Sequence, residues 1–232
     1  MNFIVRNIPN AVTCCNLSAG VLSIICASQG TAPLWGLTAM QWAWIFIGVA
    51  AVADFLDGFA ARLLHAYSAL GKELDSLCDL VSFGVAPAII MLNVLAEYGA
   101  QPWTRWLVFL IPVCGALRLA KFNIDTRQSS SFIGLPIPAN AIFWIGYSAL
   151  CMAGAEFLTQ WWCVLPVIVF ESWLMVSPLK LFSLKFKTWG WKGNRWRWTL
   201  IATAAVLVLC MGVPGLMWLI VAYVLYGAVS SD

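Results

Sequence analysis

Long runs of apolar residues without charge are the feature that most constrains what this chain of 232 residues can fold into. The chain is 62% hydrophobic and only 10% charged, and its mean hydropathy is +0.87. A helix that crosses a membrane needs about 20 mostly apolar residues. We therefore predict an all-α, polytopic transmembrane helix bundle of about eight spans. The predicted spans are 10–30, 36–62, 73–96, 103–120, 137–156, 161–183, 198–212 and 214–230.

The last two predicted spans are short, and the segment Gly-Val-Pro-Gly at 212–215 separates them. One long kinked helix is therefore the alternative for residues 198–230, because proline and glycine both disrupt a helix. We predict two spans, which makes an even number in total. The N- and C-termini are then on the same side of the membrane.

The positions of the basic residues orient these spans. Cytoplasmic loops of membrane proteins carry an excess of lysine and arginine. If both termini are cytoplasmic, Arg105 alone among the basic residues falls on the outer side. The basic residues on the predicted cytoplasmic side are Arg6, Arg62, Lys72, Arg118, Lys121, Arg127, Lys180, Lys185, Lys187, Lys192, Arg195 and Arg197. Because the basic residues gather on one predicted side of the membrane, they indicate a face toward anionic headgroups and anionic substrates. The net charge of +3 is therefore no sign of nucleic acid binding, and we predict no nucleic acid partner.

Two other sequence features exclude further classes of protein. The first apolar run contains polar residues, which is atypical of a secretory signal peptide, and we expect none. The eight cysteines are scattered without a C-x-x-C pair, so we interpret them as packing residues rather than as disulfides or zinc ligands.

Four aspartates lie close together in this apolar chain. Asp54 and Asp57 are three residues apart near the end of the second predicted span, so they share a helix face. Asp75 and Asp79 are four residues apart at the start of the third span and share a face of that helix. A short connection makes the two helices antiparallel neighbours, and four carboxylates that meet in an apolar environment repel one another. Clustered carboxylate oxygens suit Mg²⁺ or Mn²⁺, and these four are enough to hold two ions for phosphate chemistry.

Small residues beside the aspartates point to a phosphorylated ligand. Gly58 and Ala61 have small side chains, so a substrate could approach the backbone of the second helix beside the carboxylates. Gly71 gives the same access at the start of the third helix. Arg62 follows them and carries a planar donor that suits a phosphate oxygen. The alternative is that the aspartates only form ion pairs with Arg62 and Lys72 at a membrane surface.

The order of these residues resembles the signature of the CDP-alcohol phosphotransferases without a departure. The matching pattern is Asp54-x-x-Asp57-Gly58-x-x-Ala61-Arg62, then eight residues, then Gly71-x-x-x-Asp75-x-x-x-Asp79. The resemblance implies transfer of a phosphatidyl group, or a related group, from a CDP-linked donor such as CDP-diacylglycerol to an alcohol. It also implies that the aspartates hold two divalent metals on the diphosphate. Asp79 would be the catalytic base, the glycines and Arg62 would line the CDP pocket, and the protein would be a homodimer.

Several stretches outside the signature resemble the phosphatidylserine synthase branch of this family, the CDP-diacylglycerol–serine O-phosphatidyltransferases. The implied reaction joins L-serine to the phosphatidyl group and gives phosphatidylserine and CMP. We expect one membrane domain over 1–232, with a catalytic core at about 8–183 and additional spans at about 198–230. We also expect an active site that faces the cytoplasm, in a bacterial inner membrane or its equivalent. The stretches are IPNAVTCCNLSAG at 8–20, DLVSFGVAPA at 79–88, ALRLAKFN at 116–123, GLPIPANA at 134–141 and LMVSPLK at 174–180.

Five polar residues are further candidates for substrate contacts. Asn10 and Thr13 share a face of the first span and are predicted to contact the nucleotide, although Asn10 would also suit a helix cap. Arg118 and Lys121 are predicted to bind the serine carboxylate or a lipid phosphate, or else only to anchor the span at the membrane surface. Asn140 follows two prolines and is predicted to contact serine or phosphate, or else to mark only the start of a helix.

Two alternatives to the serine reaction stay open. Another acceptor, such as glycerol 3-phosphate, inositol or choline, would use the same chemistry, but a phosphorylated acceptor favours a denser basic cluster than Arg118 and Lys121 provide. A metal-ion transporter would place its aspartates near the middle of the membrane. The four aspartates here lie near the predicted cytoplasmic ends of their helices, which favours the enzyme.

Overall fold

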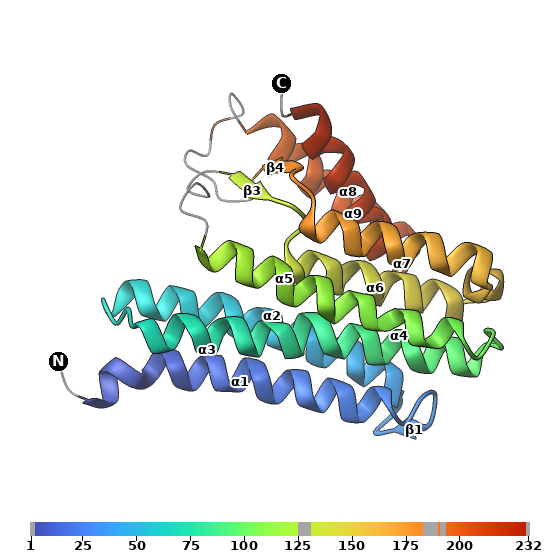
Figure 1. Cartoon of the computed structure of the whole chain (residues 1–232), viewed down its shortest axis with the longest axis horizontal. Coiled ribbons are helices and arrows are strands. Elements are labelled where there is room, and N and C mark those ends of the chain that lie inside the picture. Colours follow the sequence, from blue (N-terminus) through green and yellow to red (C-terminus); the bar gives the residue numbers. More distant parts are fainter. Residues whose placement is uncertain (1–2, 125–130, 183–189, 191–193, 231–232) are drawn as a thin grey trace.

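A computed structural model of the chain describes residues 3–124, 131–182, 190 and 194–230. These residues form a bundle of helices with two short two-stranded antiparallel sheets (Figure 1). The first helices are α1 (Phe3–Ala27), α2 (Ala39–Leu63), α3 (Ala69–Asp79), the π-helical turn η1 (Leu80–Val85) and α4 (Ala86–Glu97). The later helices are η2 (Thr104–Phe109), α5 (Leu110–Ile124), α6 (Ile137–Met152), η3 (Glu156–Thr159), α7 (Trp161–Val176), α8 (Arg195–Met211) and α9 (Gly215–Ser230). In the first sheet β1 (Pro33–Leu34) pairs with β2 (Leu37–Thr38) as a hairpin. In the second, β3 (Ser131–Ile133) pairs with β4 (Lys180–Phe182), which follows it only after α6 and α7.

Four helical segments of the described chain are long and apolar enough to cross a membrane. They are Asn7–Ala27, Ala39–Leu63, Ala69–Glu97 and Thr104–Ile124. Three shorter apolar helices accompany them, at Ile137–Met152, Trp161–Val176 and Gly215–Val229. The prediction of an all-α membrane helix bundle is therefore confirmed.

The sixth predicted span, 161–183, was too long. Helix α7 ends at Val176, and Ser177 is extended with φ −67° and ψ 156°. The reason is Pro178, because the residue before a proline is disfavoured in the helical conformation. The chain then continues as β4, which pairs with β3.

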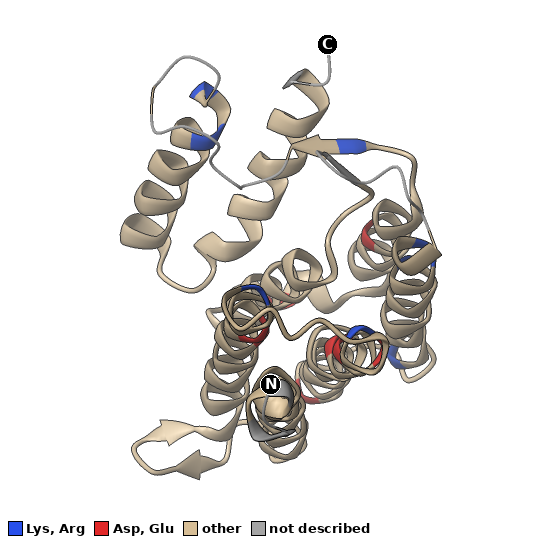
Figure 2. Cartoon of the chain, turned by 90° about the vertical axis from the view of Figure 1, so that its left-hand side faces the viewer, with Lys and Arg blue, Asp and Glu red and all other residues tan. Residues whose placement is uncertain are grey.

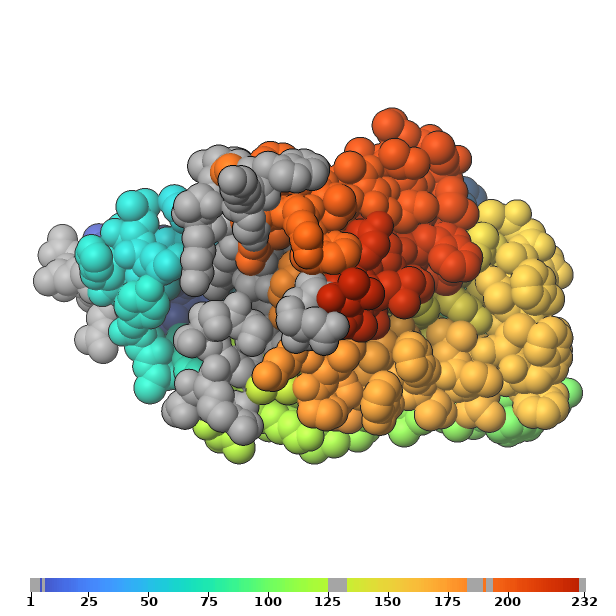
Figure 3. All heavy atoms as spheres, turned by 90° about the horizontal axis from the view of Figure 1, so that it is seen from above, coloured from blue at the N-terminus to red at the C-terminus, as the bar shows by residue number. Residues whose placement is uncertain are grey.

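Helices α8 and α9 are two separate helices, so the alternative of one long kinked helix is wrong. Gly212 ends α8 with a φ of +65°, a conformation that glycine adopts without steric cost. The two helices then pack side by side, and the hydroxyls of Thr203 and Tyr226 lie 3.1 Å apart (Figure 2). Viewed from above, this α8–α9 hairpin covers the middle of the molecule, away from the α2–α3 connection at one end (Figure 3).

Helix α1 packs along α2 and also against α3 and η1, which places its polar residues between the two aspartate-bearing helices. The approach to η1 is close at Gly20, where any Cβ atom would collide with Ser82. Ser82 is fully buried, and its hydroxyl donates to the backbone carbonyl of Asn16 at 3.0 Å. This contact fixes the height of α1 relative to the middle of the third spanning segment, Ala69–Glu97.

Candidate active site

The connection between α2 and α3 decides where the aspartates of the two helices meet. Helix α2 ends at Leu63, and His65 turns the chain with a φ of +49°. Ser68 then caps α3, since its hydroxyl accepts a hydrogen bond from the backbone N–H of Gly71 at 2.9 Å. The chain thus reverses direction within a few residues, and the end of α2 faces the beginning of α3.

Three of the four signature aspartates form a cluster. Asp54, Asp57 and Asp75 each offer a carboxylate oxygen, and these oxygens all lie within 4.8 Å of one another. Asp57 is only 6% exposed, and Asp75 Oδ1 is buried without a hydrogen-bond partner among the described residues. An unpartnered buried carboxylate oxygen beside two others is costly unless a cation binds there, so the cluster fits a hard divalent metal.

Asp57 is held in place by helix α1. The hydroxyl of Thr13 donates to Asp57 Oδ2 at 2.6 Å, and the same hydroxyl lies 3.0 Å from the carbonyl oxygen of Pro9. Both side chains are buried, with 3% exposure for Thr13. Asp57 also offers a carboxylate oxygen to the cluster. Thr13 therefore orients a predicted metal ligand, a contact in addition to its predicted role at the nucleotide.

Asp79 is separate from the three-carboxylate cluster and has its own partner on α1. Asn16 Nδ2 donates to Asp79 Oδ1 at 3.0 Å, and the two side chains are 0% and 8% exposed. Asn16 was missing from the predicted site. Its position could have identified it, because Asn10, Thr13 and Asn16 follow one another at three-residue intervals on one face of α1.

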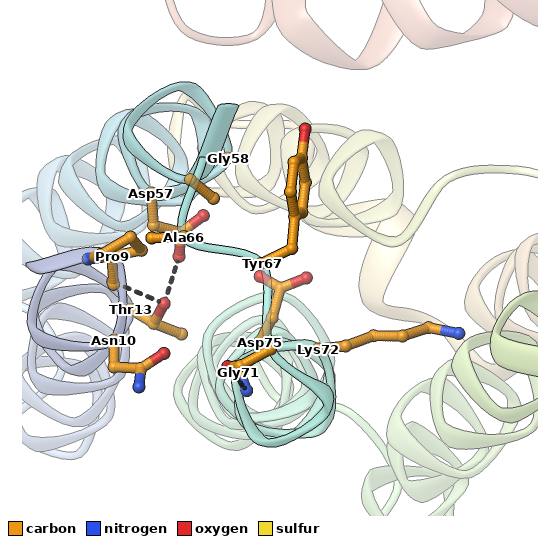
Figure 4. A pocket seen from close by; sticks show the side chains of 12 residues that line it. Pro9, Asn10, Thr13, Asp57, Gly58, Ala66, Tyr67, Gly71, Lys72 and Asp75 are labelled. Carbon is orange, nitrogen blue, oxygen red and sulfur yellow. Dashed lines mark hydrogen bonds between the residues drawn. The ribbon is translucent and has the colours of Figure 1, made fainter. Parts of the chain in front are cut away.

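A pocket opens beside the cluster at the end of the bundle (Figure 4). Its volume is about 210 Å³, and it includes five of the six residues predicted to bind CDP. The sixth, Arg62, is exposed, and its Nη1 lies 3.6 Å from the position that a Cβ atom on Gly58 would take. Lys72 Nζ points away from the aspartates and donates to the carbonyl of Asn123 at 2.9 Å, so it does not neutralise them (Figure 4). The lining residues are Pro9, Asn10, Thr13, Asp57, Gly58, Ala61, Ala66, Tyr67, Ser68, Gly71, Lys72 and Asp75.

The two glycines of the pocket differ in their surroundings. A Cβ atom on Gly71 would lie 2.9 Å from both Asn10 Oδ1 and Ser68 Oγ, so these two side chains would have to shift to accommodate it. A Cβ atom on Gly58 would meet only Arg62 Nη1, at 3.6 Å. Among the residues that the structure describes, no neighbour therefore excludes a side chain at position 58. Asn10 lies inside α1 rather than at its start, so it is not the helix cap of the alternative interpretation.

The predicted acceptor residues lie on α5 and α6. Arg118 is 7% exposed, and its Nε donates to the carbonyl of Leu135 at 2.9 Å. Its guanidinium also lies 5.4 Å from the centre of the Phe122 ring. Lys121 is exposed, and its Nζ is 3.4 Å from the carbonyl of Val176. Arg118 is thus fixed inside the bundle, whereas Lys121 lies at the surface.

Asn140 is fully buried and uses both ends of its amide inside the protein. Its Nδ2 donates to the carbonyl of Phe83 at 3.3 Å, and its Oδ1 accepts from Trp144 Nε1 at 2.9 Å. Phe83 belongs to the π-helical turn η1, which directly follows Asp79. Asn140 therefore supports the backbone behind Asp79, and its predicted contact with serine or phosphate stays a prediction.

The known proteins that this chain resembles belong to the family that its aspartate signature predicts. Residues 6–176 match the family described as CDP-alcohol phosphatidyltransferase. A Bacillus subtilis CDP-diacylglycerol–serine O-phosphatidyltransferase is 40% identical over 147 residues, which are 61% of this chain and 75% of that protein. A protein of the same name from Mycobacterium leprae is 35% identical over 182 residues, 75% of this chain and 57% of that protein. An archaetidylserine synthase from Methanothermobacter thermautotrophicus is 36% identical over 141 residues, 58% of this chain and 54% of that protein.

The chain therefore spans little more than half the length of some of these relatives. The match to the family covers the whole aspartate signature and ends at the end of helix α7. The chain belongs to the CDP-alcohol phosphatidyltransferase family, as its aspartate signature predicted.

Proposed function

We propose that this protein transfers the phosphatidyl group of CDP-diacylglycerol to the hydroxyl of L-serine and releases CMP. The observation that carries the proposal is the cluster of Asp54, Asp57 and Asp75 at a pocket lined by the signature residues. The names of the relatives support serine as the acceptor, because most of them are CDP-diacylglycerol–serine O-phosphatidyltransferases.

Asp79 is the proposed catalytic base. The serine oxygen attacks the phosphorus that carries diacylglycerol, and the bond from this phosphorus to the bridging oxygen of the diphosphate breaks. CMP leaves with the electron pair of that bond, and the serine hydroxyl proton passes to Asp79. Asn16 holds one oxygen of Asp79 through its amide, which leaves the other oxygen for the proton.

The proposed ligands of two Mg²⁺ or Mn²⁺ ions are Asp54, Asp57 and Asp75, together with Asp79. The unpartnered Asp75 Oδ1 supports this assignment, since clustered carboxylate oxygens suit hard divalent cations. When bound, such ions would offset the negative charge of the diphosphate. Thr13 orients Asp57 for this role through its 2.6 Å hydrogen bond.

The pocket residues have separate proposed roles toward the two substrates. The CDP group contacts Asn10, Thr13, Gly58, Ala61, Arg62 and Gly71, which lie in or beside one pocket. Arg118 is the proposed partner of the serine carboxylate or of the lipid phosphate, with Lys121 and Asn140 as further acceptor residues. Arg118 suits this role because its Nε is bound to a backbone carbonyl, which fixes the direction of the guanidinium.

The proposed topology places eight spans in a bacterial inner membrane or its equivalent, with both termini and the active site on the cytoplasmic side. The distribution of lysine and arginine supports this orientation. The catalytic core is proposed to be residues 8–183 of a single domain, with α8 and α9 as additional spans, and the protein is proposed to be a homodimer.

The test is release of CMP by purified protein from CDP-diacylglycerol with Mg²⁺ or Mn²⁺. Release is measured with L-serine and, separately, with glycerol 3-phosphate, inositol and choline. We expect release that depends on serine and disappears with a chelator or in Asp79→Asn. If CMP is released only with another acceptor, serine is rejected as the acceptor, but the transfer of the phosphatidyl group to an alcohol stands. If the protein binds metal but releases no CMP with any acceptor, the proposed enzyme activity is rejected and a metal-ion transporter is favoured.

A further inference from the structure

Glu171 is an acidic residue in the sixth predicted span, and the transfer of the phosphatidyl group gives it no role. It belongs to helix α7 and is only 4% exposed. Its Oε2 is buried and has no hydrogen-bond partner among the described residues. An ionisable side chain inside a membrane span is costly unless it is paired, so an unpartnered one indicates a functional site.

Glu171 lines a cavity of about 740 Å³ between α6, α7 and α9, three helices that lie together in Figure 1. This volume is within the range of small-molecule sites, about 300–1,000 Å³. Helix α6 contributes Leu150, helix α7 contributes Val167 beside Glu171, and helix α9 contributes Val221. Glu171 is the only charged residue among those that line the cavity.

The walls of this cavity are held by close contacts within the protein. Gly146 of α6 allows α9 to approach so closely that a Cβ atom there would collide with the backbone of Met217, which lines the cavity. The hydroxyl of Tyr147 donates to the carbonyl of Leu158 at 2.8 Å, and both residues also belong to the lining. The hydroxyl proton of Tyr147 is therefore already used, whereas Oε2 of Glu171 is not.

The cavity extends along α7. Phe157 and Leu158 line it just before the helix begins at Trp161, and Glu171 lines it near the other end of the helix. The ten residues from Trp161 to Glu171 cover about 15 Å at about 1.5 Å per residue. An occupant that fills this space is therefore extended and apolar over most of its length, with a polar group at the Glu171 end.

The lining also selects the charge of that polar group. No lysine, arginine or histidine is among the described residues that line the cavity, so a cation for the Glu171 carboxylate has to come from the occupant. Aromatic rings attract an ammonium group, and more strongly where water is excluded. A phosphate here would instead lie near the carboxylate without a basic partner. The aromatic residues of the lining are Phe143, Tyr147, Phe157, Phe170 and Trp218.

We propose that this cavity binds a long-chain alkylammonium, a lipid-soluble primary amine without a phosphate group, whose ammonium pairs with Glu171. The hydrocarbon chain runs along α7 toward Phe157 and Leu158. The site is distinct from the aspartate pocket, because the two linings share no residue. The inference does not depend on the proposed function, since it concerns binding and not transfer.

The test uses the purified full-length protein and three photoreactive probes. Each probe has a dodecyl chain that carries a diazirine, and the three end in an amine, an alcohol and a phosphate. We expect the amine to label cavity-lining peptides of α6 and α9, and the other two probes to label them about tenfold less. An effect of this size is expected because hydrogen bonds to charged groups are among the stronger ones.

The variant Glu171→Gln keeps the size of the side chain and removes its charge. We expect labelling by the amine to fall about tenfold in this variant and to stay largely intact in Glu171→Asp, which keeps the charge. Glu156→Gln is the matched control, because Glu156 is an exposed carboxylate near the start of α7, and its labelling should not change.

Thermal unfolding shows whether the variant folds and gives a second measure of binding. Without a probe, Glu171→Gln should unfold at the same temperature as the wild type or higher, because it buries no unpaired carboxylate. Dodecylamine should raise the unfolding temperature of the wild type and not that of Glu171→Gln. Equal labelling of these two proteins by the amine, or equal labelling of the wild type by the amine and the alcohol, would overturn the proposal. Labelling by the amine only outside the cavity would also overturn it.

Discussion

Helix α1 donates a hydrogen bond to two of the four signature aspartates, Asp57 and Asp79, and Asp75 differs from them. Thr13 donates to Asp57 and Asn16 donates to Asp79, each through a buried side chain. Asp75 instead keeps a buried oxygen without a partner among the described residues. A neutral donor fixes the direction of a carboxylate, whereas a free buried oxygen needs a cation. The difference separates two aspartates whose side chains helix α1 orients from a proposed metal ligand that has an unpartnered buried oxygen.

The largest expected effects come from removing a carboxylate on each side of this comparison. We expect Asp75→Asn to abolish both CMP release and tight Mn²⁺ binding, because the cluster loses its unpartnered oxygen. We expect Asp79→Asn to lower kcat by about 10²–10⁴-fold, the usual contribution of a general base. Mn²⁺ titration by electron paramagnetic resonance should show more binding in Asp79→Asn than in Asp75→Asn. If both variants lose Mn²⁺ binding equally, Asp75 and Asp79 do not differ in their contribution to metal binding.

The next effect concerns the donor to Asp79. We expect Asn16→Ala to lower kcat by about 10–100-fold with little change in KM, since side chains that orient functional groups typically contribute this much. Ser18→Ala is the matched control on the same helix, because the Ser18 hydroxyl is exposed and bonds only to the Cys14 carbonyl among the described residues. An unchanged kcat in Asn16→Ala would show that Asp79 needs no positioning by α1.

A smaller effect is expected at the donor to Asp57. Thr13→Val keeps the shape of the side chain and removes its 2.6 Å hydrogen bond to Asp57. We expect Mn²⁺ affinity to fall by about tenfold, at the low end of the range for residues that support metal ligands. Thr13→Ser restores the hydroxyl and should restore affinity. If Thr13→Ser is as weak as Thr13→Val, packing of the methyl group is the cause instead.

The smallest expected effects distinguish the two pocket glycines. Gly71→Ala would crowd Asn10 and Ser68, so we expect a lower melting temperature and a loss of stability of about 1–3 kcal/mol. Gly58→Ala meets only Arg62, so its melting temperature should be unchanged or slightly higher while the KM for CDP-diacylglycerol rises. Thermal unfolding and kinetics on both variants check this. A normal KM in Gly58→Ala would mean that no substrate approaches the backbone there.

The sequence alone determined the membrane bundle and the aspartate site. Apolar runs long enough to cross a bilayer predict spanning helices, because a backbone in lipid must satisfy its hydrogen bonds internally. The spacing of Asp54 and Asp57, and of Asp75 and Asp79, placed each pair on one helix face. The short connection between the two helices then predicted that the pairs meet, and the structure brings Asp54, Asp57 and Asp75 into one cluster. These inferences need only local geometry, which is why they could be made without a structure.

Only the tertiary structure decided which aspartates are partnered and where the C-terminal helices lie. The hydrogen bond from Asn16 to Asp79 joins residues 63 positions apart, and nothing in the local spacing of either segment fixes it. The hairpin of α8 and α9 depends on the turn at Gly212 and on the close contact of Gly146 with α9. Such contacts arise from the packing of whole helices, whose rotation and height are set by many side chains at once. The spacing of residues in a sequence shows which of them share a helix face, but it does not show which other helix packs against that face.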